Sequence, residues 1–136
     1  MQVSEIMTAD PDTCQPTDSL RSVAMKMAEG DYGSVPVVDD GRLIGVVTDR
    51  DITIRAVAQG RGADTEVGDV MTPDPICVSP DTEIEDAADI MQEEQIRRLF
   101  VTDDDDRLVG VVALGDIALE EDDDLSGETL GEISED

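Results

Sequence analysis

The sequence predicts an α+β fold (α/β layered) in which one β-α-β-β-α unit occurs twice. The first observation is a duplication: a Met-Thr pair at 7–8 recurs at 71–72, and RLIGVVTDRDI at 42–52 recurs as RLVGVVALGDI at 107–117. The second observation is an apolar spacing typical of amphipathic helices in both copies. The third is a pair of short apolar runs after each of these helices, as in a β-hairpin.

The first helix of each repeat is predicted from one apolar face. In the first copy the apolar residues follow helical spacing, at Leu20, Val23, Ala24, Met27 and Ala28. Thr17 or Asp18 is expected to cap the start of this helix, and Gly30 is expected to end it. In the second copy, Thr82 and Glu85 have the spacing of a capping box before the same apolar face.

The remaining elements are predicted from short apolar runs. Hairpins are expected from the runs at 35–38 with 43–47 and at 99–102 with 108–112, each pair joined by an acidic turn. A second helix is expected at 49–59, and a short extended piece is expected before each first helix, at 13–15 and at 76–79. Because one repeat of this size buries little surface, we expect the two copies to close their cores against each other.

The repeats predict three segments along the chain. Residues 1–62 form the first repeat, and residues 63–118 form the second. Residues 119–136 are nearly all acidic or small and polar, which predicts a flexible C-terminal tail.

The charge of the chain limits its partners. The formal net charge is −26 at pH 7, and Lys26 is the single lysine. A field this negative repels nucleic acids and anionic lipids, so neither is an expected partner. Acid in place of lysine suits a salt-rich cytoplasm, where molar salt screens charges to within about 3 Å. The first residues show neither the basic region nor the hydrophobic run of a signal peptide, and no apolar run approaches the length that spans a membrane. We therefore expect a cytoplasmic protein, and the charge leads us to expect a halophilic one.

The residue types present argue against catalysis and against a metal site. The chain has no histidine, and Cys14 and Cys77 are isolated from each other. Zinc sites usually need about four closely spaced Cys, His or carboxylate ligands, and acid–base catalysis near neutral pH usually relies on histidine. We therefore expect no catalytic residue and no metal, and we expect both cysteines to be buried free thiols.

The order and spacing of the repeated motifs resemble a tandem CBS-domain pair, the Bateman module. The resemblance is carried by GSVPVVDDGRLIGVVTDRDI at 33–52, by RRLFVTDDDDRLVGVVALGDI at 97–117 and by the two Met-Thr starts. The stretches TDRDI, RAVAQG and IRRLFV are similar to those of small stand-alone CBS-pair proteins of the hypoxic-response and IMP-dehydrogenase-related type. The resemblance implies two repeats packed with pseudo-twofold symmetry, with clefts between them for adenosine-containing ligands.

The resemblance also implies which residues bind the ligand. The family signature Gly-x-x-Thr/Ser-x-x-Asp reads Gly45, Thr48 and Asp51 here. An Asp one turn into a helix can accept two ribose hydroxyls, and a Thr hydroxyl with the open N–H groups of a helix start can hold a phosphate or ribose oxygen. Gly45 would let the ligand or neighbouring backbone approach closely. By the same resemblance, the base is edged by backbone near Thr13, Pro16, Val35 and Pro36.

The second copy departs from this signature. It keeps Gly110 and Asp116 but has Ala113 in place of Thr or Ser, so its cleft is expected to bind more weakly or to be empty. Phe100 stands where the first copy has Pro36, and we interpret it as filling core volume in preference to stacking on adenine.

The few cations gather near the predicted sites. Arg50 lies beside Asp51 in sequence, and Arg97 and Arg98 precede the second hairpin. Arg50 and Arg98 are therefore predicted ligand contacts, because a phosphate entering so acidic a protein needs a local reversal of charge. The alternative for Arg97 and Arg98 is that they form ion pairs with Glu93 and Glu94 in place of binding a phosphate.

Two functions are consistent with these residues. The first is a non-catalytic regulatory module that needs no cofactor, binds AMP, ADP, ATP or S-adenosylmethionine, and signals by a conformational change to a separate protein effector. The resemblance implies that it forms a homodimer. The second function is a ligand-free structural or interaction platform, which Ala113 and the extreme acidity favour, whereas Thr48, Asp51 and Asp116 favour the first. On the platform interpretation, Thr48 and Asp51 form an ordinary capping box.

Overall fold

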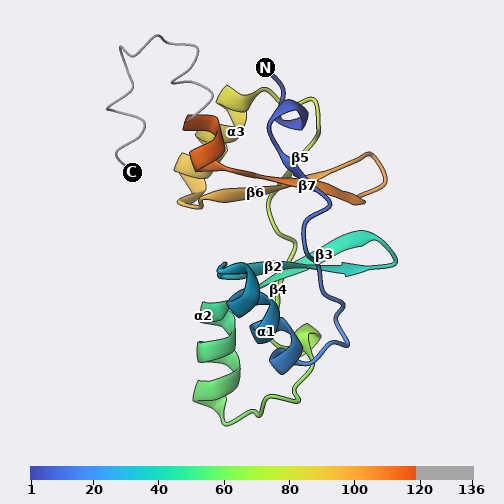
Figure 1. Ribbon diagram of the computed structural model, residues 1–136, viewed down its shortest axis with the longest axis vertical. Helices are drawn as coiled ribbons and strands as arrows, with labels where there is room; N and C mark the ends of the chain where they lie inside the picture. Colours follow the sequence, from blue (N-terminus) through green and yellow to red (C-terminus); the bar gives the residue numbers. More distant parts are fainter. Residues whose placement is uncertain (119–136) are drawn as a thin grey trace. The chain divides into compact units, whose positions relative to one another are not determined.

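The computed structural model describes residues 1–118, which form two compact units (Figure 1). Unit 1 comprises Met1–Pro11, Ile76–Asp104 and the described part of Val109–Asp136, whereas unit 2 comprises Asp12–Pro75 and Asp105–Leu108. Each unit contains helices and strands, which confirms the predicted α+β fold class. The acidic segment 119–136, for which we predict a flexible tail, lies outside the described residues.

Unit 2 is built on a three-stranded antiparallel sheet. Its strands are β2 (Ser34–Asp39), β3 (Arg42–Thr48) and β4 (Thr72–Pro73), in the order β2-β3-β4. Asp40 and Gly41 join β2 to β3 and have positive φ angles of 54° and 80°. Positive φ at both central residues is what a two-residue turn needs to match the twist of its two strands. The hairpin predicted from the apolar runs of the first copy is confirmed.

Two helical segments lie on the same side of this sheet (Figure 1). The first is α1 (Leu20–Gly30), and the second consists of α2 (Asp49–Asp51), the π-helical turn η2 (Ile52–Ala56) and the 3₁₀ turn η3 (Val57–Gln59). The helix predicted at 49–59 is therefore present. Its change of helical pitch has no counterpart in the sequence pattern.

The cap of α1 differs from the prediction. The hydroxyl of Ser19 accepts a hydrogen bond from the Ser22 N–H at 3.2 Å, so Ser19 is the N-cap in place of Thr17 or Asp18. Asp18 accepts the N–H of Gln15 at 2.8 Å and thereby closes the turn before the helix. Several small polar residues precede α1, and the local turn decides which of them acts as the cap.

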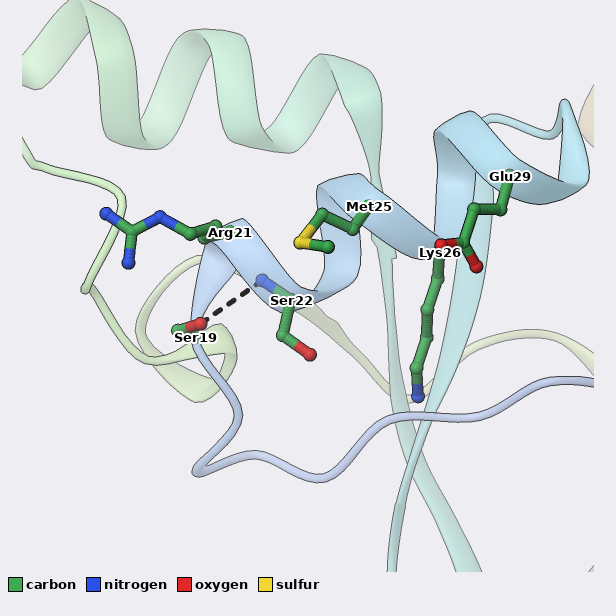
Figure 2. Close-up of a pocket in the computed structure, with 6 residues that line it drawn as sticks. All are labelled: Ser19, Arg21, Ser22, Met25, Lys26 and Glu29. Carbon is green, nitrogen blue, oxygen red and sulfur yellow. Dashed lines mark hydrogen bonds between the residues drawn. The ribbon is translucent and has the colours of Figure 1, made fainter.

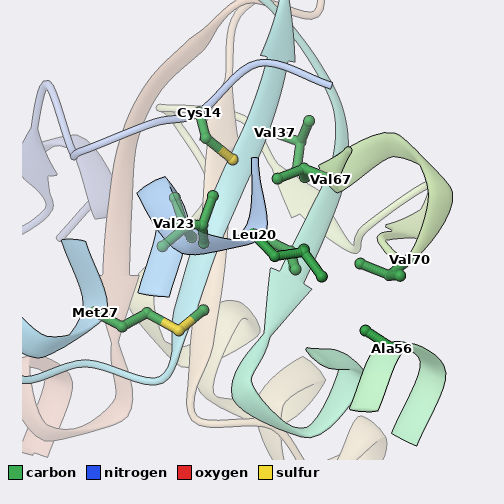
Figure 3. Close-up of a cluster of buried hydrophobic side chains, with 10 residues drawn as sticks. Cys14, Leu20, Val23, Met27, Val37, Ala56, Val67 and Val70 are labelled. Carbon is green, nitrogen blue, oxygen red and sulfur yellow. The ribbon is translucent and has the colours of Figure 1, made fainter. Parts of the chain in front are cut away.

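The core of unit 2 lies between the sheet and its helices (Figure 3). Alternate residues of β2, Val35 and Val37, are fully buried against the predicted apolar face of α1. The complete cluster consists of Cys14, Leu20, Val23, Met27, Val35, Val37, Val47, Ala56, Val67 and Val70. The strand and helix periodicities of the first repeat therefore locate its core.

Unit 1 repeats this arrangement with one more strand. Its sheet has the order β1-β7-β6-β5, formed by β1 (Thr8–Ala9), β7 (Leu108–Ala113), β6 (Arg98–Thr102) and β5 (Cys77–Val78). α3 (Ile84–Glu94) and the helical residues 114–118 lie on one side of it (Figure 1). Its core consists of Val3, Val78, Ile84, Ala87, Met91, Leu99, Val101, Val112 and Ile117. Most of these are repeat equivalents of the unit 2 core residues.

The expected capping box of α3 is not formed. Glu83 occupies the N-cap position and makes no side-chain cap hydrogen bond. The hydroxyl of Thr82 instead accepts the Ser79 N–H at 3.2 Å in the preceding turn. The helix therefore starts one residue later than the spacing of Thr82 and Glu85 predicts. Both first helices end at a residue in the left-handed conformation, which is Asp31 in place of the predicted Gly30 for α1.

Each unit contains a short arm from the start of the repeat whose remaining elements lie mainly in the other unit. The 3₁₀ turn η1 (Val3–Glu5) and β1 belong to unit 1, where the first N–H of η1 donates to the Thr82 carbonyl at 2.8 Å. The 3₁₀ turn η4 (Val67–Asp69) and β4 belong to unit 2, where the first N–H of η4 donates to the Asp18 carbonyl at 2.8 Å. The compact units are thus discontinuous in sequence.

Candidate functional site

Thr48 and Asp51 form a reciprocal capping box where β3 ends and the helical stretch 49–59 begins. The Asp51 N–H donates to Thr48 Oγ1, and the Thr48 N–H donates to Asp51 Oδ2, both at 3.0 Å. The box satisfies an N–H group of the helix start and fixes the Asp51 carboxylate relative to that helix. The structure thus brings together the two residues on which the predicted site depends.

The Asp51 carboxylate is also contacted from the start of the second repeat. Thr72 Oγ1 donates to Asp51 Oδ1 at 3.3 Å and to Oδ2 at 3.4 Å. Arg55, one helical turn further on, has its Nε 3.9 Å from Oδ1. Only 12% of the Asp51 side chain is exposed, so these contacts occur in a largely desolvated position. Thr72 is not among the predicted site residues. The feature of the sequence that could have indicated it is the Met-Thr pair, which occurs in both repeats.

Arg55 ties the helical stretch to that same segment. Its Nη1 donates to the carbonyls of Val70 at 3.2 Å and of Met71 at 3.1 Å. The Arg55 side chain is 49% exposed, so the guanidinium is shared between these carbonyls and solvent. Arg50, a predicted ligand contact on the same stretch, is exposed.

Gly45 provides space for the chain's own backbone. A Cβ at Gly45 would lie 2.9 Å from the Thr72 carbonyl oxygen and 2.7 Å from Met71 Sδ. At the equivalent Gly110 in unit 1, a Cβ would lie 3.0 Å from the Thr8 carbonyl oxygen. The glycine of this signature is predicted to admit either a ligand or neighbouring backbone. The close approach of neighbouring backbone explains the glycine at both Gly45 and Gly110.

The stretches predicted to edge the base both lie in unit 2. The side chain of Val35 is buried in the core, so only the backbone of Val35 could contact a ligand. The Pro36 carbonyl accepts the Cys14 N–H at 3.0 Å, which joins the two stretches directly. The Pro16 carbonyl accepts the Gly68 N–H at 2.9 Å, so this carbonyl is already hydrogen-bonded to η4.

A shallow hollow lies on the outer face of α1 (Figure 2), lined by Ser19, Arg21, Ser22, Met25, Lys26 and Glu29. Both of its cations are engaged within the chain. Arg21 pairs with Asp64 at 2.9 Å, and Lys26 Nζ donates to the Thr13 carbonyl. We therefore assign the single lysine a structural task, which is to hold the predicted base-edging stretch at Thr13.

The second copy of the signature lies in unit 1 and lacks the capping hydroxyl. β7 ends at Ala113 and helical residues begin at 114, so Ala113 occupies the position of Thr48 without an oxygen to accept the Asp116 N–H. Asp116 is half-buried, and Gly110 is buried. Unit 1 therefore holds the predicted aspartate at a less constrained helix start.

Two further residues of unit 1 concern the predicted site. Phe100 is 7% exposed, as expected of a side chain that fills core volume. Arg98 is exposed. Among residues 1–118, neither Arg97 nor Arg98 forms an ion pair with Glu93 or Glu94.

The two cysteines differ from each other. Cys14 is buried, as expected, and burial raises the pKa of its thiol to about 11; the Asp18 carboxylate adds to the increase, and Lys26 opposes it. Cys77 is exposed, so the prediction of burial was wrong for it, because β5 lies at the edge of its sheet. Within residues 1–118, no three His, Cys, Asp or Glu side chains are grouped as a metal site would require. That part of the chain also contains no helix with the length and apolar character needed to cross a bilayer.

Comparison with known proteins decides the family. Residues 3–57 and 67–122 each match the CBS domain. The chain belongs to the CBS-domain family. It is 40% identical over 129 residues to the CBS domain-containing protein YhcV of Bacillus subtilis, a match that covers 95% of this chain and 89% of YhcV. It is 36% identical over 116 residues to Hypoxic response protein 1 of Mycobacterium tuberculosis, covering 84% of this chain and 80% of that protein.

Two solved CBS-pair structures are similar to this one and were determined with adenosyl ligands. The AMP complex of CBSX2 from Arabidopsis thaliana is 29% identical with a TM-score of 0.79, covering 92% of this chain and 98% of that chain. The CBS-domain pair of protein MJ0100, in complex with 5′-methylthioadenosine and S-adenosyl-L-methionine, is 27% identical with a TM-score of 0.78, covering 91% and 98%. The predicted two-repeat CBS fold and the resemblance to the hypoxic-response type are thereby confirmed.

Proposed function

We propose that this chain is a non-catalytic regulatory CBS pair that binds an adenosyl ligand (AMP, ADP, ATP or S-adenosylmethionine) and transmits a conformational change to a separate protein. The observation that carries the proposal is the Thr48–Asp51 box at a strand-to-helix junction. Support comes from similar CBS pairs that hold AMP or S-adenosylmethionine. A binding role also needs no general base, in keeping with a chain that has no histidine.

The capping box leaves both side chains with capacity to bind a ligand. Thr48 Oγ1 accepts one hydrogen bond within the box, whereas a hydroxyl has two lone pairs and one proton to donate. Asp51 Oδ2 accepts the Thr48 N–H, and the contacts of Oδ1 with Thr72 and Arg55 are long, at 3.3 and 3.9 Å. A carboxylate has about four acceptor positions, so Asp51 retains capacity for two ribose hydroxyls. The cap and the ligand contact are therefore compatible, and the cap orients the carboxylate in advance.

A ligand-free interaction platform is the second candidate function. It is favoured by the internal partners that the Asp51 carboxylate already has and by Ala113, which removes the hydroxyl from the second copy. In this case the box at Thr48 serves the stability of the helical stretch alone.

Calorimetric titration with AMP, ATP and S-adenosylmethionine in molar KCl separates the two functions. For the ligand that binds, Asp51→Ala is expected to weaken affinity about 5- to 150-fold, the equivalent of losing about 1–3 kcal/mol of hydrogen bonds to a charged group. Asp116→Ala is expected to have a smaller effect. Asp49→Ala is the matched control, because it removes the same charge from an exposed neighbouring position.

The outcomes of this titration are distinct. No heat with any of the three ligands, from wild-type protein whose circular dichroism shows an intact fold, would support the platform. Equal losses for Asp51→Ala and Asp116→Ala would contradict the assignment of the stronger site to the first copy. A loss for Asp49→Ala as large as that for Asp51→Ala would point to charge alone in place of a specific contact.

We also propose that the protein is a homodimer in a salt-rich cytoplasm. Three apolar side chains on α1 and the helical stretch 49–59 are exposed: Met25 by 56%, Ile54 by 44% and Val57 by 67%. Exposed apolar surface of this kind supports an interface with a second copy, and the net charge of −26 needs screening for two copies to associate. Sedimentation equilibrium is expected to show a dimer in about 2 M KCl and a monomer for Val57→Asp. A wild-type monomer at high salt would contradict the proposal.

A further inference from the structure

The Thr72 hydroxyl bridges both oxygens of the Asp51 carboxylate, at 3.3 and 3.4 Å. Thr72 lies in β4, near the start of the second repeat, and is not part of the Gly45–Thr48–Asp51 signature. A hydroxyl placed between the two oxygens of a carboxylate favours one orientation of the carboxylate, although at 3.3 and 3.4 Å each contact is longer than a strong charge-assisted hydrogen bond. With the Thr48 N–H on Oδ2, Thr72 completes a two-point hold on the Asp51 side chain.

The backbone, and not the hydroxyl, places Thr72 at this position. β4 pairs with β3 so that Thr72 lies opposite Val46, two residues before Thr48. The missing side chain of Gly45 admits the Thr72 carbonyl, and Arg55 holds the carbonyl of the preceding residue at 3.1 Å. Removal of the hydroxyl alone is therefore expected to leave the segment in place and to release only the carboxylate.

We propose that Thr72 is a positioning residue for ligand binding, whose hydroxyl holds the Asp51 carboxylate in the orientation that accepts the ribose hydroxyls. This inference rests on the proposed adenosyl-binding function and adds to it a residue from outside the family signature. Without the hydroxyl, Oδ2 keeps the Thr48 N–H at 3.0 Å, but Oδ1 keeps only the distant Arg55 guanidinium, at 3.9 Å, so the carboxylate is held at one oxygen in place of two. Ligand binding then has to order the side chain, which lowers affinity.

Unit 1 supplies a matched control. Thr8 lies opposite Val111 in β7, as Thr72 lies opposite Val46, and its carbonyl lies over Gly110 in the same way. The helix start that follows β7 has Ala113 in place of the capping threonine. Thr8→Val therefore removes the same atom from an equivalent backbone position without acting on Asp51.

The effect of Thr72 is expected to depend on the ribose hydroxyls, because the residue acts through Asp51. We would titrate AMP and 2′,3′-dideoxy-AMP into wild-type protein, Thr72→Val, Thr72→Ser and Thr8→Val, with unfolding temperatures measured for each. Thr72→Val is expected to weaken AMP binding about 3- to 10-fold, the range for one lost hydrogen bond. Thr72→Ser keeps the hydroxyl and is expected to stay within about 2-fold of wild type, as is Thr8→Val. Binding of the dideoxy analogue is expected to be the same for wild type and Thr72→Val.

Each departure from this pattern has a defined meaning. If Thr72→Val binds AMP as tightly as the wild-type protein does, the inference is overturned and the proposed function still stands. Equal losses for AMP and its dideoxy analogue would also overturn it, because they would show a general structural effect. If Thr72→Val fails to fold, Thr72→Ala takes its place in the same comparison. Binding of S-adenosylmethionine without AMP would overturn the inference as stated but keep the function, whereas no adenosyl binding at all would overturn both.

Discussion

Replacing Gly45 by alanine tests whether close backbone approach is the reason for the glycine of the signature. The added Cβ would lie 2.7 Å from Met71 Sδ and 2.9 Å from the Thr72 carbonyl oxygen. A rotamer change can move the sulfur, but the carbonyl belongs to β4, which is paired with β3 and directly follows Met71, whose own carbonyl accepts a hydrogen bond from Arg55. Backbone movement must therefore relieve the contact, and overpacking of this kind usually costs about 1–3 kcal/mol.

The measurement is the free energy of unfolding in urea, at one fixed concentration of KCl, together with the unfolding temperature. Gly45→Ala is expected to lower the unfolding temperature by about 4–12 °C, since about 1 kcal/mol corresponds to roughly 4 °C for a domain of this size. Gly62→Ala is the control, because no atom lies within 4 Å of its added Cβ. This control is expected to be unchanged or slightly stabilised, by less than about 1 kcal/mol, through the unfolded chain.

Gly110→Ala repeats the experiment in unit 1. Its Cβ would lie 2.5 Å from Met7 Sδ and 3.0 Å from the Thr8 carbonyl oxygen, so a loss similar to that of Gly45→Ala is expected. A Gly45→Ala protein as stable as Gly62→Ala, within about 0.5 kcal/mol, would refute the steric argument. The glycine would then have to be explained by ligand approach alone.

Two further predictions concern the cysteines and the missing cap. Because its pKa is raised to about 11, the Cys14 thiol stays protonated below that pH, so maleimide near pH 8 is expected to label exposed Cys77 in the native protein and Cys14 only in urea. Mass spectrometry of digested protein measures this, and equal native labelling of both would contradict the burial of Cys14. Ala113→Thr is expected to stabilise the protein by about 1 kcal/mol, because it gives the helix start at 114 an oxygen for the Asp116 N–H. A loss of stability in urea unfolding would show that this helix start cannot use a cap at position 113.

The helices and hairpins were predictable because their signals are local. Leu20, Val23 and Met27 lie on one face at helical spacing, and all three are in the core of unit 2. The box between Thr48 and Asp51 was predictable for the same reason, because its partners are three residues apart. The caps of the first helices were predicted less well, since several small polar residues compete for the position and the preceding turn decides between them.

The sequence by itself determined the duplication, the apolar faces that form the two cores, and the pair Thr48 and Asp51 at a helix start. Only the tertiary structure decided which sheet each arm joins and that Thr72 meets Asp51. The physical reason is that two-residue strands such as β1 and β4 have no pattern of their own, and their hydrogen bonds depend on a strand far away in the chain. The role of Gly45 belongs to the same class, because the atoms that exclude a side chain there come from that distant strand.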